Sequence, residues 1–166
     1  MNDDNTSWQR SIEALWDRFG KLSPDAFLSE MSALAAVRPA GDPMALFELA
    51  SAHDALDREQ EAAILYRRAL SGELPENVRR QAVIQLASTL RNLGELEESV
   101  GLLKAEVGRS DELDDAVLAF LCLSLIDAGR PREAAARALA ALATHLPRYR
   151  KSVTTYANAI LSDDLD

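Results

Sequence analysis

The sequence of 166 residues is poor in cysteine, glycine, proline and aromatic residues. Its one cysteine, Cys122, cannot form an internal disulfide and does not by itself supply a metal site, which fits a reducing cytoplasm. Seven glycines and six prolines are too few for a protein of many short strands and turns. Aromatic residues make up only 5%, so the apolar share of 48% consists mainly of alanine and leucine, which favour helices. The composition therefore predicts an all-α protein.

Basic residues and long apolar runs are also scarce. The 18 lysines and arginines are outnumbered by 27 acidic residues, and the net charge of -9 repels the phosphates of a nucleic acid. No apolar run approaches the roughly 20 residues that span a bilayer. The start, Met1 to Asn5, lacks the basic and apolar stretches of a secretion signal. We therefore expect a soluble, cytoplasmic protein that binds neither nucleic acid nor membrane.

Capping residues and stop signals divide the chain into nine predicted helical segments with short links. Residues 1–6 are polar and are expected to be frayed, with Thr6 or Ser7 capping a first helix that Gly20 ends. Ser23-Pro24-Asp25 combines a cap, a proline at the first helical position and an acid near the helix N-terminus, which predicts a second helix over about 24–37. Asp42-Pro43 repeats this signal. No change in composition marks a second domain.

Three later segments match one another when the sequence is compared with itself at an offset. The first segment contains Leu46, Leu49, Ala50, His53, Leu56, Ala62 and Tyr66. A shift of 37 positions gives Val83, Leu86, Ala87, Leu90, Leu93, Ser99 and Leu103, and a further shift of 35 gives Leu118, Leu121, Cys122, Leu125, Ala128, Ala134 and Ala138. The residue types correspond, and a period of this length is typical of stacked helical hairpins.

These residues resemble the signature of the tetratricopeptide repeat (TPR) family. The resemblance covers about residues 43–147 and implies a right-handed superhelical solenoid of antiparallel helix hairpins. Two helices cross closely only where small residues meet. The places for them are Ala50 with Ala62, Ala87 with Ser99, and Cys122 with Ala134. Gly94 and Gly129 suit the left-handed conformation after a helix, and Asp57 takes that place in the first repeat.

The resemblance gives the expected organisation of one domain over residues 7–161. It comprises a degenerate capping hairpin at 7–41, repeats at 43–75, 80–111 and 115–147, and a capping helix at 148–161. An acidic tail at 162–166 is expected to follow this domain. The capping helix is expected to turn Val153, Tyr156, Ala157 and Ile160 inward. The stretches Gln85 to Gly94 and Leu146 to Tyr149 are similar to small bacterial stand-alone TPR proteins of unassigned role.

Binding in this family uses mainly the concave groove lined by the first helix of each hairpin. The groove positions implied here are Phe47, Ser51, Asp54, Gln81, Ile84, Gln85, Ser88, Arg91, Asn92, Ala119, Leu123 and Asp127. Ser88, Arg91 and Asn92 share one helix face and offer donors for a peptide backbone or a carboxylate. The alternative interpretation is a face that is simply solvated.

One known use of the family can be tested against these positions. The clamp that grips chaperone C-termini resembles a set of two lysines, two asparagines and an arginine. The corresponding places here are Phe47, Ser51, Gln85, Ala116 and Phe120. The clamp is missing, so we expect a groove for a mixed polar and apolar segment or a helix.

Catalytic, metal and cofactor sites are not expected. His53 and His145 lie far apart in the sequence and lack the closely spaced partners of a zinc site, and His53 takes an apolar packing place. Cys122 takes a small-residue place and is interpreted as a buried, inert thiol. The sequence has no glycine-rich phosphate loop and no serine elbow. The basic run Arg148 to Lys151 is interpreted as a solvated helix end rather than an anion site.

Two functions therefore remain open. The first is a non-catalytic adaptor or scaffold that binds a peptide or helix of a partner protein in the groove. The second is a structural module that forms a weak homodimer through apolar residues of an end helix, such as Trp8 or Trp16.

Overall fold

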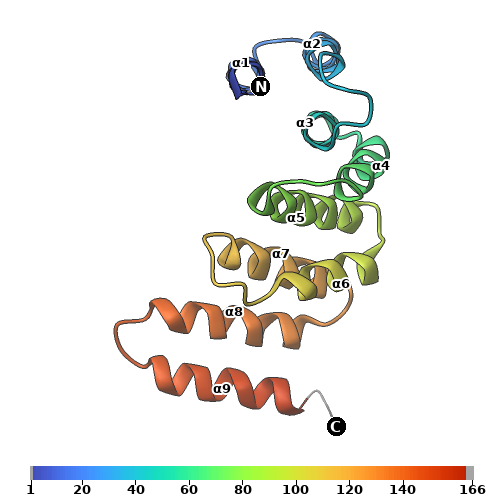
Figure 1. Cartoon of the computed structure of the whole chain (residues 1–166). Helices are drawn as coiled ribbons and strands as arrows, with labels where there is room; N and C mark the ends of the chain where they lie inside the picture. The colour runs from blue at the N-terminus through green and yellow to red at the C-terminus, as the bar shows by residue number, and fades with distance from the viewer. Residues whose placement is uncertain (1, 164–166) are drawn as a thin grey trace. The chain divides into compact units, whose positions relative to one another are not determined.

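The computed structural model describes residues 2–163, and within this range it contains nine α-helices and no strand. The helices are α1 (Asn2–Trp16), α2 (Pro24–Ala36), α3 (Pro43–Asp54), α4 (Glu59–Leu70), α5 (Glu76–Asn92), α6 (Leu96–Glu106), α7 (Asp114–Asp127), α8 (Pro131–His145) and α9 (Arg150–Asp163). The predicted all-α fold is confirmed. Each predicted repeat corresponds to a helix pair in Figure 1, with α3 and α4, α5 and α6, and α7 and α8 joined by short links.

The contacts divide the chain into two compact units, whereas the sequence predicts one continuous domain. Unit 1 extends to Thr89 and unit 2 begins at Leu90, so the boundary falls inside α5. In a helical repeat each hairpin touches only its neighbours, and no single core spans the whole chain. The two units are therefore described separately.

The core of unit 1 is formed by the apolar stripes of the first helices. Ile12, Phe27 and Met31 are among its buried members, and Trp8 is buried beside them. The Trp8 indole donates a hydrogen bond to the Leu34 carbonyl at 2.9 Å, which satisfies its one polar atom. Burial of these side chains holds α1 on α2. Ala45 and Ala52 of α3 belong to the same cluster, so the predicted capping hairpin shares its core with the first repeat.

The helix starts of unit 1 follow the predicted caps in two of three cases. The Ser23 hydroxyl accepts from the Ala26 amide at 3.3 Å, and the Asp42 carboxylate accepts from the Ala45 amide at 2.9 Å. By contrast, α1 begins at Asn2, ahead of the predicted cap at Thr6 or Ser7. Of the predicted frayed segment, Met1 lies outside the described residues.

The links between helices contain residues with positive φ where the sequence predicts them. Asp57 has φ 56°, Gly94 has φ 81° and Gly129 has φ 74°. Two further non-glycine residues share this conformation, Ser110 with φ 61° and Tyr149 with φ 66°. The Ser110 amide donates to the Asp114 carboxylate at 2.8 Å, a side-chain bond that stabilises the turn before α7.

In unit 2, two helices contact each other directly at a predicted pair of small residues. The Cys122 thiol of α7 donates to the Ala134 carbonyl of α8 at 3.2 Å, so these two helices approach at the predicted pair. Ser99 of α6 and Ser124 of α7 form a buried hydroxyl pair at 2.8 Å. The helix α9 runs back along α8 (Figure 1).

The predicted inward face of α9 needs one correction. Ala157 is fully buried and Val153 and Ile160 are half-buried, whereas Tyr156 is 69% exposed. Tyr156 directly precedes Ala157, and the adjacent helical position points about 100° away from the buried one. The acidic end also differs, because α9 continues to Asp163 and residues 164–166 lie outside the described range.

Candidate functional site

The predicted groove residues of unit 1 are mostly covered by neighbouring helices. Phe47, Ser51 and Ile84 are buried, with exposed fractions of 6%, 9% and 6%. The other members are half-buried, namely Asp54, Gln81, Gln85 and Ser88. Phe47 packs on Tyr66 of α4 with ring centroids 6.3 Å apart. The apolar positions of this part of the groove therefore belong to the core of unit 1.

A chain of polar contacts joins α3, α4 and α5 within unit 1. The Ser51 hydroxyl lies 3.4 Å from the Gln85 amide oxygen and 3.4 Å from the Tyr66 hydroxyl. The Thr89 hydroxyl donates to the Asp54 carboxylate at 2.9 Å. Burial raises the pKa of the Tyr66 phenol, so it stays protonated. These contacts use Ser51, Asp54 and Gln85 inside the protein.

Asp54 is the member of this polar chain whose negative charge is disfavoured by burial. Burial raises the pKa of its carboxyl, the Thr89 hydroxyl lowers it, and the negative charges of Glu59 and Asp57 raise it again. The net pKa lies above the usual 3.8. Folding therefore penalises the charged carboxylate, and the cost is complete once the pH exceeds the raised pKa.

We expect Asp54→Asn to raise the free energy of unfolding at pH 7. An asparagine carbonyl still accepts from Thr89, and it carries no charge to bury. The gain should shrink as the pH falls toward 4, because the wild-type carboxyl then takes up its proton and loses the penalty. Urea denaturation of both proteins at pH 7 and pH 4.5 measures the difference. A destabilised variant at pH 7, or a gain that grows on acidification, would contradict this assignment.

The predicted groove residues of unit 2 are more accessible. Ala119, Leu123 and Asp127 lie at successive four-residue steps on α7 and are all exposed, Leu123 to 43%. The Arg91 Nε donates to the Asp127 carboxylate at 2.6 Å, and Asn92 is exposed next to it. A guanidinium has five N–H donors, of which this bond uses one. The structure thus brings Arg91 and Asp127 together beside an exposed apolar row.

The clamp positions carry no lysine or arginine. Phe47, Ser51 and Gln85 belong to the packed part of unit 1, and Ala116 and Phe120 of α7 are half-buried. Electrostatic recognition of a carboxylate needs donors such as the five N–H groups of an arginine. None of these five side chains carries a positive charge.

The histidines and the cysteine have surroundings that match a structural role. His53 is half-buried, and burial lowers the pKa of its imidazole. Its Nδ1 atom is buried without a hydrogen-bond partner. Burial also raises the pKa of the Cys122 thiol, which keeps it in the less nucleophilic form. His145 is exposed and lies 3.2 Å from the Asp115 carboxylate.

The described part of the chain contains neither a cluster of metal-ligating side chains nor a membrane-spanning helix. No group of three or more histidine, cysteine, aspartate or glutamate side chains is placed to hold a metal ion there. Among the helices of residues 2–163, none has the length and apolar character needed to cross a membrane. The basic run Arg148 to Lys151 is exposed, and the Arg150 guanidinium donates to the Thr144 carbonyl at the end of α8.

Sequence reasoning missed one feature of unit 2, an apolar hollow between α7 and α8. Its lining includes Leu118, Ala119, Cys122, Ala138 and Leu142. Of these, only Ala119 was assigned to a binding surface. The offset comparison could have revealed the hollow, because the place held by Tyr66 in the first repeat and Leu103 in the second is held by the much smaller Ala138 in the third.

Comparison with known proteins gives one match. The family model described as Tetratrico peptide repeat matches residues 43–160. The match extends beyond α8 and through most of α9, which the sequence assigned to a cap outside the repeats. No curated protein matches, and neither does any solved structure.

Proposed function

Because the chain belongs to the tetratricopeptide repeat family, whose members generally mediate protein–protein interactions, we propose that it binds a segment of a partner protein. The binding surface is the exposed row on α7 together with the end of α5, and its members are Arg91, Asn92, Ala119, Leu123 and Asp127. We call this set the α7 surface. The family is typically non-catalytic, and the proposed role requires neither a cofactor nor a metal ion.

The observation that carries this proposal is the exposed row beside a fixed arginine. Leu123 offers apolar area that is 43% exposed, and one turn later Asp127 holds the Arg91 guanidinium at 2.6 Å. An arginine fixed in this way loses less side-chain entropy when it donates to a ligand. A segment with an apolar side chain on Leu123 and a carbonyl or carboxylate at Arg91 matches this arrangement.

Because the α7 surface offers only a few contacts, we expect a moderate affinity for the partner segment. Hydrogen bonds to a charged group contribute about 1.5–3 kcal/mol each and neutral ones about 0.5–1.5 kcal/mol. With burial of Leu123, such contacts support a dissociation constant near 1 μM, or about -8 kcal/mol. We place this adaptor in the cytoplasm, where a chain with one cysteine needs no disulfide.

The alternative of a homodimer through end-helix tryptophans gains no support from their positions. Trp8 is buried in unit 1 with an exposed fraction of 6%. Trp16 is half-buried and donates to the Glu48 carboxylate at 2.9 Å. Both indoles are therefore engaged within unit 1, and we do not propose self-assembly through them.

We expect the double variant Arg91→Ala, Asn92→Ala to weaken binding at least tenfold, or about 1.4 kcal/mol. The probe is a peptide selected from a random library displayed against the wild-type protein, and calorimetry measures its affinity. The pair Arg148→Ala, Asn158→Ala serves as the control, because it removes the same groups from exposed positions at another place in unit 2. Circular dichroism checks that both variants keep their helices. Equal affinity of the double variant and wild type would refute the α7 surface.

A further inference from the structure

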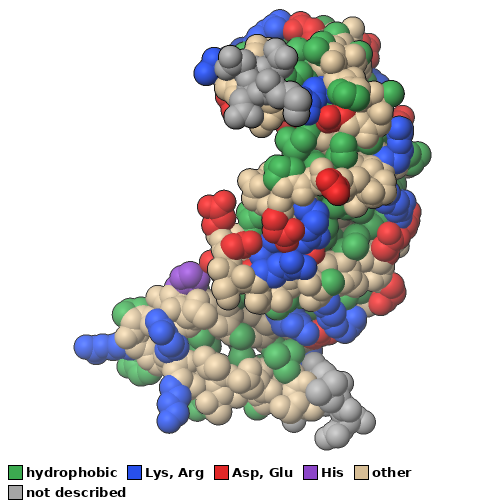
Figure 2. All heavy atoms as spheres, in the orientation of Figure 1, with side chains coloured by type: hydrophobic (Ala, Val, Ile, Leu, Met, Phe, Trp, Pro, Cys, Tyr) green, Lys and Arg blue, Asp and Glu red, His purple; other side chains and the backbone are tan. Residues whose placement is uncertain are grey.

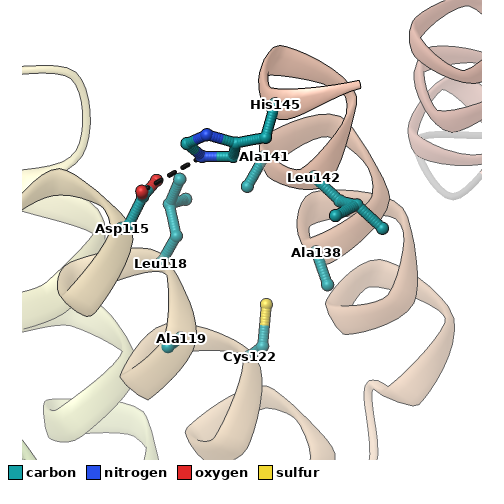
Figure 3. Close-up of a pocket in the computed structure, with 8 residues that line it drawn as sticks. All are labelled: Asp115, Leu118, Ala119, Cys122, Ala138, Ala141, Leu142 and His145. Atoms are coloured by element: carbon teal, nitrogen blue, oxygen red, sulfur yellow. Dashed lines mark hydrogen bonds and ion pairs between the residues drawn. The ribbon is translucent and has the colours of Figure 1, made fainter. Parts of the chain in front are cut away.

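An apolar hollow of about 300 Å³ opens between α7 and α8 in unit 2. Figure 3 shows Cys122 and Ala138 facing each other at one end, with Asp115 and His145 at the other. Leu142 is 52% exposed at its edge. Figure 2 shows further hydrophobic side chains beside basic ones on the surface of the C-terminal helices. The hollow is therefore apolar inside and open to solvent.

The hollow exists because the third repeat has alanines where the earlier repeats have large side chains. The residue at the place of Ala119 is Phe47 in the first repeat and Ile84 in the second. The place of Ala138 holds Tyr66 and then Leu103. In the first repeat the two rings fill this space, with centroids 6.3 Å apart and both side chains buried. In the third repeat α7 and α8 still form the hairpin. Alanines replace the two large side chains, so the space that those side chains would fill is left open.

The size and polarity of the hollow define what can fill it. An apolar cavity of about 150 Å³ is enough to bind benzene, so this space accommodates an aromatic ring with its methylene. The charged acceptor on its lining is Asp115, whose side chain is 67% exposed. Asp115 belongs to an acidic stretch that includes Glu112. A positive charge next to the ring would pair with this carboxylate.

We propose that the hollow takes a phenylalanine or similarly large apolar side chain of the bound segment, and that a lysine or arginine beside it pairs with Asp115. This proposal rests on the proposed function and deepens it. Ala119 belongs both to the hollow and to the α7 surface, so one extended segment can reach the two together. The partner is therefore a protein segment with an aromatic anchor and an adjacent basic residue.

Two variants that restore the residues of the second repeat test the hollow. Ala119→Ile and Ala138→Leu each fill it with a side chain that the same place accepts in the second repeat. The probe is a peptide obtained by display selection on the wild-type protein. We expect its affinity to fall at least tenfold for Ala138→Leu and to stay unchanged for Ala135→Leu, which adds the same bulk at an exposed position of α8 outside the lining. Replacing the aromatic residue of the peptide by alanine should abolish the difference between Ala138→Leu and wild type.

A second measurement does not depend on the folding of any variant. Cys122 is the only cysteine of the chain and lines the hollow, so the rate at which it reacts with a thiol reagent reports access to this space. We expect the selected peptide to slow the reaction at least tenfold in the wild-type protein. An unchanged rate with the peptide bound overturns the proposal.

The outcomes separate the hollow from the proposed function. If Ala138→Leu binds the peptide normally while Arg91→Ala, Asn92→Ala does not, the α7 surface is correct and the hollow is not its anchor site. If selection yields no peptide, or only peptides without an aromatic residue, the anchor proposal fails. If the wild-type protein is a dimer by light scattering and Ala138→Leu makes it a monomer, the occupant is a second copy and the proposal is wrong.

Discussion

Tyr66→Ala is expected to lower the free energy of unfolding by about 3–5 kcal/mol, the range for removing a large aromatic side chain from a core. Tyr66 is fully buried, packs on Phe47 and places its hydroxyl 3.4 Å from Ser51. Its removal leaves a cavity between α3 and α4. Urea denaturation followed by circular dichroism measures the change.

Tyr66→Phe is the matched control for this substitution. It keeps the ring and removes only the hydroxyl, so the expected loss is about 0.5–1.5 kcal/mol. A loss for Tyr66→Ala no larger than for Tyr66→Phe would contradict the packing of this ring. The third repeat naturally has alanine, Ala138, at the place equivalent to Tyr66, and it still forms its hairpin. The loss measured for Tyr66→Ala therefore shows how much stability a large side chain adds at this place.

Ala50→Phe is expected to destabilise the protein by about 1–3 kcal/mol or more, the usual cost of overpacking a well-packed site. Ala50 of α3 and Ala62 of α4 are both fully buried, and these two helices pack on each other. A ring in place of the Ala50 methyl group forces the helices apart. Thermal unfolding monitored by circular dichroism detects this as a lowered melting temperature.

The matched control is Ala33→Phe, which adds the same ring at an exposed position of α2 in the same unit. Its expected effect is about 0.5 kcal/mol or less, as for most surface substitutions. If Ala50→Phe melts like the control, the register of small residues at the helix crossing is wrong.

Local chemistry made the helices and their links predictable from the sequence. Ser23 and Asp42 cap their helices as expected because each supplies an acceptor to an otherwise unpaired amide. Asp57, Gly94 and Gly129 take the left-handed conformation as expected. Tyr149 was not predicted there, because nothing in its residue type favours a positive φ.

The candidate site was harder to predict because it depends on contacts between helices. The sequence placed Ser51, Asp54 and Gln85 in the groove, and it could not reveal that hydrogen bonds use them within unit 1. The pairing of Arg91 with Asp127 joins residues that are far apart in the chain and has no local signal. Ser51 and Leu123 occupy equivalent places in the first and third repeats, yet Ser51 is buried and Leu123 is exposed, because the two places have different neighbours.

Nuclear magnetic resonance of the isotope-labelled protein with a display-selected peptide tests binding to the α7 surface most directly. Titration should shift the amide signals of Asn92, Ala119, Leu123 and Asp127, together with the Arg91 side-chain signal, at peptide concentrations near 1 μM to 10 μM. Saturable shifts confined to α1, α2 or the outer face of α9, with these signals unmoved, would contradict the account.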